Sequence, residues 1–125
     1  MQRQTPQRLA IKAALAGIGR PLTPLEILDV ARVRVPSLNL ATVYRTLRRM
    51  GDAGEIAPVE LPGEPPRYQP REAAEHHHHH FRCTTCHAVF NVEGCVEGLK
   101  KLLPKGFRMT AHDIVLYGLC RSCAV

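Results

Sequence analysis

The stretch that decides the fold runs from Asn39 to Gly51 and reads N-L-A-T-V-Y-R-T-L-R-R-M-G. Asparagine is a favoured helix N-cap and glycine a common helix stop, so the stretch predicts a helix over residues 40–50. One stripe at helical spacing is apolar and predicts the buried face: Leu40, Val43, Leu47 and Met50. A second stripe, about 130° around the helix, carries Ala41, Tyr44, Arg45 and Arg48, with Thr42 and Arg49 beside it.

The second stripe suits DNA as well as solvent. Arginine reads guanine edges or pairs with phosphates, and small or aromatic side chains contact thymine methyl groups. On an isolated helix the same pattern is more often a solvated basic face, so the surroundings must decide. Two capped helices are predicted before it, starting at Thr5-Pro6 and Thr23-Pro24, and short strands after it at 56–60 and 67–69. Three helices followed by a hairpin predict a winged helix-turn-helix domain over residues 1–69.

Composition narrows the class of protein. The net charge of +6 and the sequence pI of about 9.4 favour a polyanionic partner such as double-stranded DNA. No run of eighteen apolar residues occurs, so no membrane span is expected, and the first residues lack the apolar core of a secretory signal. We therefore expect a cytoplasmic protein. No acid–base pair and no nucleophile with a positioned base is visible, so an enzyme is not expected.

The pattern changes after a hinge predicted at residues 70–77. Residues 78–83, 88–92 and 107–117 are predicted strands, and residues 96–103 a short helix with Gly98 inside it. The sequence thus predicts an α+β chain with a small C-terminal α/β domain over residues 78–125. Residues 114–117 are apolar on both faces, which a domain this small can hardly cover alone. A second copy of the chain is the expected cover, which predicts a homodimer that uses this domain for dimerisation.

Four of the five cysteines form two Cys-x-x-Cys pairs, Cys83 with Cys86 and Cys120 with Cys123. Cytosolic thiols stay reduced, so metal ligation or redox chemistry is expected rather than a disulfide framework. A redox Cys-x-x-Cys normally opens a helix, whereas one of these pairs follows a predicted strand and the other lies near the C-terminal end. The pairs therefore predict one structural zinc ion per chain.

The five histidines His76–His80 precede Cys83 closely. In an extended strand His76, His78 and His80 point one way, and His77 and His79 the other, so two faces could serve two metal sites. A solvated polar tract is the alternative. His112 and His87 are further candidates, although a lone strand histidine such as His112 is more often structural.

Three motifs together carry a resemblance to a family. They are Ala41 to Leu47 (A-T-V-Y-R-T-L), the histidine run before Cys83, and His112 followed by L-Y-G-L-C-x-x-C ending at Cys123. In this order they closely resemble the ferric uptake regulator family. The resemblance implies a winged-helix domain, a dimerisation domain and a four-cysteine structural zinc. It also implies that Tyr44 and Arg45 contact DNA, that His78 and His80 belong to a regulatory site at the hinge, and that His77, His79 and His112 belong to a second site.

The departures from that family bear on the regulatory metal. Pro21, Gln69 and Asn91 stand where the family often has ligands of the hinge site, and Gly98 aligns with a carboxylate of the second site, for which Glu97 is a substitute. Cys95 is a candidate soft ligand to join His78 and His80, expected at the start of the short helix, or else a small buried hydrophobe. Imidazole and thiolate without carboxylates favour zinc over manganese or iron, so a second, regulatory ion is predicted to be zinc or iron, with zinc favoured.

These observations predict a metal-responsive repressor that controls metal homeostasis genes. The alternative is a metal buffer or interaction module that keeps the fold without sensing, which the missing hinge ligands would suit. Tyr44 and Arg45 separate the two hypotheses, because a buffer has no use for them.

Overall fold

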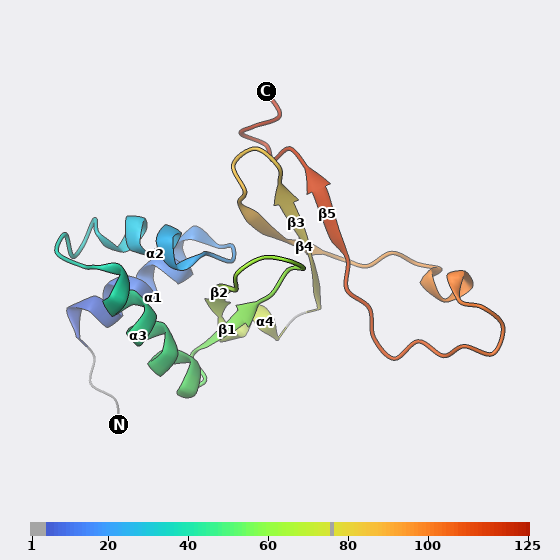
Figure 1. The fold of residues 1–125 in the computed structure, drawn as a ribbon, viewed down its shortest axis with the longest axis horizontal. Coiled ribbons are helices and arrows are strands. Elements are labelled where there is room, and N and C mark those ends of the chain that lie inside the picture. Colours follow the sequence, from blue (N-terminus) through green and yellow to red (C-terminus); the bar gives the residue numbers. More distant parts are fainter. Residues whose placement is uncertain (1–4, 76) are drawn as a thin grey trace. The chain divides into compact units, whose positions relative to one another are not determined.

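The computed structural model describes residues 5–75 and 77–125, so His76 lies outside the described residues. Figure 1 shows the order of the elements: helices predominate in the first part of the chain and strands in the last part. The chain divides into two compact units, residues 1–76 and 77–125, and each is described here by itself. No helix of the described residues is long and apolar enough to cross a membrane.

Three helices build the first unit, as the sequence predicts: α1 (Pro6–Ile18), α2 (Pro24–Ala31) and α3 (Leu40–Asp52). Each begins at a side chain that accepts a hydrogen bond from a free backbone N–H of its first turn: Thr5, Thr23 and Asn39. Thr23 and Glu26 complete the expected capping box. The apolar stripe of α3 faces the core: Leu40 is partly buried, Leu47 is buried, and Val43 and Met50 are fully enclosed in the cluster shared with α1 and α2.

The end of α3 differs from the prediction. Gly51 was expected to stop the helix, but it lies within it, and the helix runs to Asp52 with Ala53 as its C-cap. Gly54, with φ of 74°, is the residue that takes the left-handed conformation and turns the chain into the next strand. A glycine ends a helix only where the chain needs positive φ, and the sequence alone does not say which of two nearby glycines adopts it.

A two-stranded antiparallel sheet completes the winged helix. β1 (Ile56–Val59) pairs with β2 (Arg67–Pro70). β1 ends one residue earlier than predicted, and β2 ends one residue later. Leu22 adds a bridge to Tyr68 through two backbone hydrogen bonds of 2.9 and 2.8 Å, which ties the start of α2 to the hairpin. The segment expected to be a hinge contains a short helix, α4 (Arg71–Ala74), in contact with both strands.

The second unit is a three-stranded sheet of order β4-β3-β5. The central strand β3 (His78–Cys83) has the predicted bounds, and β4 (Val89–Glu93) is antiparallel to it. β5 (Val115–Gly118) runs parallel to β3, with His80 opposite Val115 and Cys83 opposite Gly118. The side of β5 away from β3 carries no further strand among the described residues.

Between β4 and β5 the chain leaves the sheet and returns, forming a projecting arm over residues 94–114 (Figure 1). The predicted helix over 96–103 is wrong except for one 3₁₀ turn, η1 (Leu99–Leu102), because Gly98 adopts a left-handed φ of 83° and starts the turn instead of lying inside it. The predicted long strand over 107–117 is also wrong. Only Val115–Gly118 forms a strand, because the preceding residues have no strand of the described chain to pair with.

Candidate metal centres and nucleic-acid interface

The four paired cysteines meet at one end of the sheet. Cys83 ends β3, Cys86 follows in the turn, and Cys120 and Cys123 lie in the turn after β5. Their sulfur atoms all lie within 4.8 Å of one another, and the Sγ atoms of Cys86 and Cys120 are 3.8 Å apart. Zinc–sulfur bonds of about 2.3 Å at tetrahedral angles place sulfurs about 3.8 Å apart. The cluster therefore has the donor set and the spacing of a four-thiolate zinc centre.

Backbone geometry brings the two pairs together. The turn after β3 closes through Cys83 N–H donating to the Ala88 carbonyl at 2.9 Å and His87 N–H donating to the Cys83 carbonyl at 3.0 Å. Thr84 N–H donates to the Gly118 carbonyl at 2.8 Å and joins this turn to the end of β5. Gly118 packs against the Phe81 ring, where an added Cβ would lie 3.3 Å from a ring carbon. Because Gly118 has no side chain, β5 can lie close to β3 at this point.

Hydrogen bonds favour the thiolate at Cys83 and the protonated thiol at Cys123. The backbone N–H groups of Cys86 and Cys120 donate to Cys83 Sγ at 3.4 and 3.5 Å, and they lower the pKa of Cys83 to about 5. Hydrogen bonds to Cys120 and Cys83 raise the pKa of Cys123 to about 12. Without an ion, four close sulfurs share protons because they cannot all carry negative charge. A divalent cation removes that conflict by taking the place of the protons.

A second group of donors lies where the arm leaves and rejoins the sheet. It comprises His77, His79, Cys95 and His112, whose donor atoms all lie within 4.8 Å of one another; we call it the His–Cys cluster. The Nε2 atoms of His77 and His79 are 3.1 Å apart, and Cys95 Sγ lies 3.3 Å from His79 Nε2 and 3.0 Å from His112 Nε2. Ligands of one tetrahedral zinc ion lie about 3.3–3.6 Å apart. The three contacts are at or slightly below that spacing and every other pair is within 4.8 Å, so the four side chains converge closely enough to share one ion.

The ionisation of the buried member of this cluster also fits a metal ligand. His79 is only 4% exposed, and burial lowers its pKa, with the imidazoles of His77 and His112 lowering it further. Asp113 acts in the opposite direction. A lowered pKa keeps the ring neutral near pH 7, and neutral imidazole is the form that binds metal.

The structure distributes the sequence candidates differently from the prediction. Cys95 was assigned to the site of His78 and His80, but it lies with His77, His79 and His112 instead. It does not begin a helix, since the residues from 95 to the turn at Gly98 are not helical. Glu97, the predicted substitute carboxylate, is exposed and not part of either donor group found among the described residues. Cys95 therefore takes the position in the second site for which the carboxylate of Glu97 was predicted.

His78 and His80 lie on the opposite face of β3 from the His–Cys cluster. Their cross-strand neighbours on β4 are Glu93 and Asn91. Burial lowers the pKa of His80, and the imidazoles of His78 and His79 lower it further. Neither residue belongs to a group of three or more donors within the described residues, so the hinge site stays a prediction from the family resemblance.

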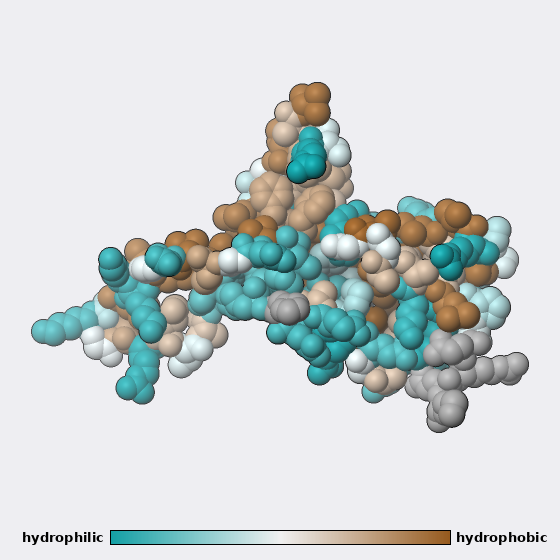
Figure 2. All heavy atoms as spheres, turned by 180° about the vertical axis from the view of Figure 1, so that it is seen from behind, coloured by the Kyte–Doolittle hydropathy of each residue, from teal (hydrophilic) through white to brown (hydrophobic). Residues whose placement is uncertain are grey.

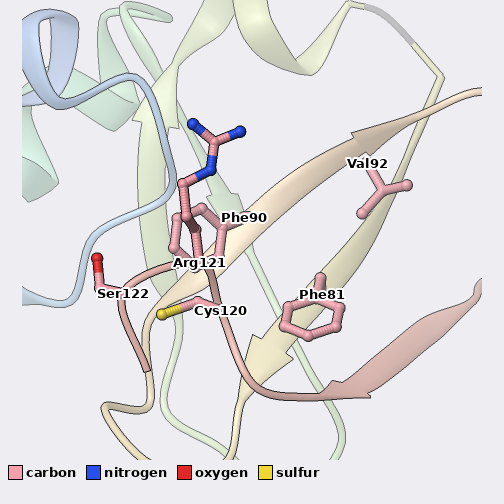
Figure 3. A pocket seen from close by; sticks show the side chains of 6 residues that line it. All are labelled: Phe81, Phe90, Val92, Cys120, Arg121 and Ser122. Atoms are coloured by element: carbon pink, nitrogen blue, oxygen red, sulfur yellow. The ribbon is translucent and has the colours of Figure 1, made fainter. Parts of the chain in front are cut away.

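An apolar pocket of about 520 Å³ occupies the face of the sheet that carries His79 and Cys83. It is lined by Phe81 from β3, by Phe90 and Val92 from β4, and by the turn Cys120, Arg121 and Ser122 (Figure 3). Figure 2 shows apolar surface on the second unit and along the arm, mixed with polar residues. Large apolar side chains exposed there include Leu102, Phe107, Leu116, Tyr117 and Leu119. The pattern is typical of a surface covered by another protein chain.

The candidate nucleic-acid interface lies on α3. Ala41, Tyr44, Arg45, Arg48 and Arg49 are all exposed, and Thr42 is half-buried. Tyr44 leaves 54% of its surface open to solvent, so its ring is accessible to a binding partner. Arg45 Nη2 donates to Thr42 Oγ1 at 3.2 Å, which directs the guanidinium toward the first half of the helix. In a helix-turn-helix domain, that is the half that contacts base edges.

Comparison with known proteins defines the class. The sequence pattern of the Ferric uptake regulator family matches residues 2–117. The chain is 32% identical over 124 residues to the zinc uptake regulation protein of Mycobacterium tuberculosis, covering 97% of this chain and 94% of that one. It is 29% identical to the ferric uptake regulation protein of Bacillus subtilis, covering 95% of this chain and 83% of the relative.

Comparison with solved structures gives the same class of protein. A zinc-bound manganese uptake regulator superposes with a TM-score of 0.81 at 27% identity, covering 95% of this chain and 91% of that one. A zinc uptake regulator in complex with zinc and DNA superposes with a TM-score of 0.55 at 27% identity, covering 98% and 83%. The chain belongs to the ferric uptake regulator family. It is a metal-responsive DNA-binding transcriptional regulator and not an enzyme, with the α+β fold of a winged-helix domain followed by a small α/β domain.

The four-thiolate cluster gives a first prediction. Cys86→Ser should lower the zinc content of the purified protein by about one atom per chain and destabilise the second unit, because three thiolates hold zinc less tightly than four. Metal analysis by mass spectrometry together with thermal unfolding measures both effects. Ser122→Ala, in the turn between Cys120 and Cys123, is the matched control and should keep its zinc. A Cys86→Ser protein with full zinc and unchanged unfolding would contradict the assignment.

Proposed function

We propose that this chain is a homodimeric repressor of metal homeostasis genes that acts in the cytoplasm and binds DNA when the His–Cys cluster holds a metal ion. The observation that carries the proposal is the presence of two complete four-donor groups in a chain whose winged helix exposes an arginine-rich face. The four-thiolate cluster serves as the structural zinc site, and the His–Cys cluster as the site that senses metal.

The exposed face of α3 supports the DNA-binding role. In this role Arg45 and Tyr44 enter the major groove, while Arg48 and Arg49, nearer the end of the helix, pair with phosphates. The net charge of +6 favours the encounter with DNA. A metal buffer would gain nothing from leaving Tyr44 and three arginines exposed on one helix, so the alternative function is not favoured.

The second unit supports dimerisation. β5 is an edge strand with an open hydrogen-bonding side, and Leu116, Tyr117 and Leu119 expose about half of their surfaces there. Removing such a surface from water stabilises an interface by about 25 cal/mol for each Å² of apolar area buried. A second copy of the chain can cover this edge and the arm, and a dimer would present two α3 helices to successive major grooves, about 34 Å apart.

The position of the His–Cys cluster suggests how metal controls DNA binding. Cys95 and His112 stand at the two roots of the arm, and His77 is the first residue of the second unit. One ion bonded to all of them would fix both roots of the arm to the segment where the chain enters this unit. The arm carries apolar residues that a partner would cover, such as Leu102 and Phe107. Metal binding would then favour the dimer and restrict the linker to the DNA-binding unit at the same time.

The arginine face gives a second prediction. Arg45→Ala should cost about 1–3 kcal/mol of binding to a duplex selected from random sequences by the wild-type protein. Arg48→Ala should weaken binding to all sequences alike and reduce the salt dependence by about one unit of slope, because it contacts phosphate. Fluorescence anisotropy at several salt concentrations measures both.

Arg34→Ala is the matched control, because Arg34 is also exposed but lies in the turn after α2. It should bind the selected duplex as the wild type does. Unchanged affinity of Arg45→Ala would show that α3 does not read the sequence.

The two faces of β3 give a third prediction. Replacing His77 and His79 with Ala should abolish the stimulation of DNA binding by metal while leaving the structural zinc in place, because the His–Cys cluster loses half of its donors. Replacing His78 and His80 with Ala removes as many imidazoles from adjacent positions of the chain, and metal should still stimulate binding. The measurement is the affinity for the selected duplex at a series of free zinc concentrations.

The reverse pattern would place sensing at the hinge site and refute the proposal. If both double variants lost the metal response, the two sites would have to act together, and the His–Cys cluster would not be the sensor by itself.

A further inference from the structure

The sulfur atom of Cys95 is the one non-nitrogen donor of the His–Cys cluster. Its Sγ is within hydrogen-bond distance of the Nε2 atoms of both His79 and His112. All three imidazoles present the same ring nitrogen to the cluster, since His77 meets His79 through Nε2. The ring centroids of His77, His79 and His112 lie 4.6–5.2 Å apart. The rings therefore surround one point, and the thiol occupies the remaining side.

The backbone accounts for this placement. Gly94 follows β4 with φ of 92°, a left-handed conformation that L side chains rarely adopt. The turn directs Cys95 back toward β3, where its sulfur contacts His79, sixteen residues earlier in the sequence. Cys95 is exposed, so it does not fill a core as small buried cysteines do. Its contacts are with nitrogen donors.

The donor set is chemically selective. No carboxylate belongs to the cluster in the described part of the chain, and the nearby Glu97 is exposed and outside it. Oxygen donors suit hard ions such as Mn²⁺, whereas thiolate and imidazole suit zinc and ions of similar softness. A divalent ion here would replace the thiol proton, which passes to solvent, and would keep one net positive charge after binding one thiolate and three neutral imidazoles.

From these observations we infer that Cys95 is the residue that sets the ion selectivity of the regulatory site. Three imidazoles and one thiolate make it a site for zinc and other borderline or thiophilic divalent cations, against Mn²⁺ and Fe²⁺. The inference rests on the His–Cys cluster being the metal site proposed above. It adds that a sulfur ligand determines which metal ion activates this regulator.

Cobalt(II) tests the ligand directly, because a cobalt–thiolate bond gives a charge-transfer band in the near ultraviolet that cobalt–imidazole bonds do not. Full-length protein holding one zinc ion per chain at the four-thiolate cluster is titrated with Co²⁺. The wild type should bind one further ion and develop the band of a single thiolate. Cys95→Ser should bind Co²⁺ without the band. Glu97→Gln, which changes an exposed neighbour outside the cluster, should match the wild type.

Competition between ions tests the selectivity. Cys95→Ser should lose at least about 10–100-fold in zinc affinity, the loss typical even of a group that only supports a metal ligand. Cys95→Asp should narrow the preference for Zn²⁺ over Mn²⁺, because it supplies a hard oxygen in place of sulfur.

Two outcomes would overturn the inference: cobalt bound by the wild type without a thiolate band, or a zinc-to-manganese preference unchanged in both variants. Either could occur while metal still stimulates DNA binding, so the proposed function would survive. Failure of the wild type to bind any second ion would instead refute the proposed function itself.

Discussion

The second unit contains very little hydrophobic core, and much of the structure follows from that shortage. The buried apolar residues described there are Cys83, Ala88 and Val89, whereas most of those of the first unit form one cluster shared by three helices and the wing. A unit of 49 residues with so small a core is not expected to be stable by itself. Two other sources can supply the missing stability. A structural zinc ion in a small peptide contributes on the order of 10 kcal/mol, and the exposed apolar edge at β5 can be buried by a second copy.

The alternation of side chains along β3 determines on which face of the sheet each candidate metal ligand lies. Odd-numbered residues of the strand share one face, which carries His79 of the His–Cys cluster at one end, Phe81 of the apolar pocket in the middle and Cys83 at the other end. The even-numbered His78 and His80 face the other way. Because the period of a strand is two, a shift of one residue in register would exchange the two sets of histidines. Both candidate metal centres therefore depend on the pairing of β3 with its neighbours.

Local patterns in the sequence predicted much of this arrangement. The caps and apolar stripe of α3, the bounds of β3 and the pairing of the Cys-x-x-Cys motifs depend on spacing of a few residues or on a well-marked strand. Predictions failed where long-range pairing or a left-handed glycine decided the outcome. Gly98 starts a 3₁₀ turn instead of sitting within a helix, and residues 107–114 form no strand because nothing in the described chain pairs with them. Cys95 reaches His79 and His112 through the turn at Gly94, which spacing in the sequence does not reveal.

The central claim is that one metal ion binds between His77, His79, Cys95 and His112. Crystals of the full chain grown with zinc, with diffraction data collected on both sides of the zinc absorption edge, would test it most directly. The account predicts two anomalous peaks per chain, one among the four sulfur atoms of the paired cysteines and one at the convergence of the three imidazoles with Cys95. A second peak beside His78 and His80, with none at Cys95, would contradict it.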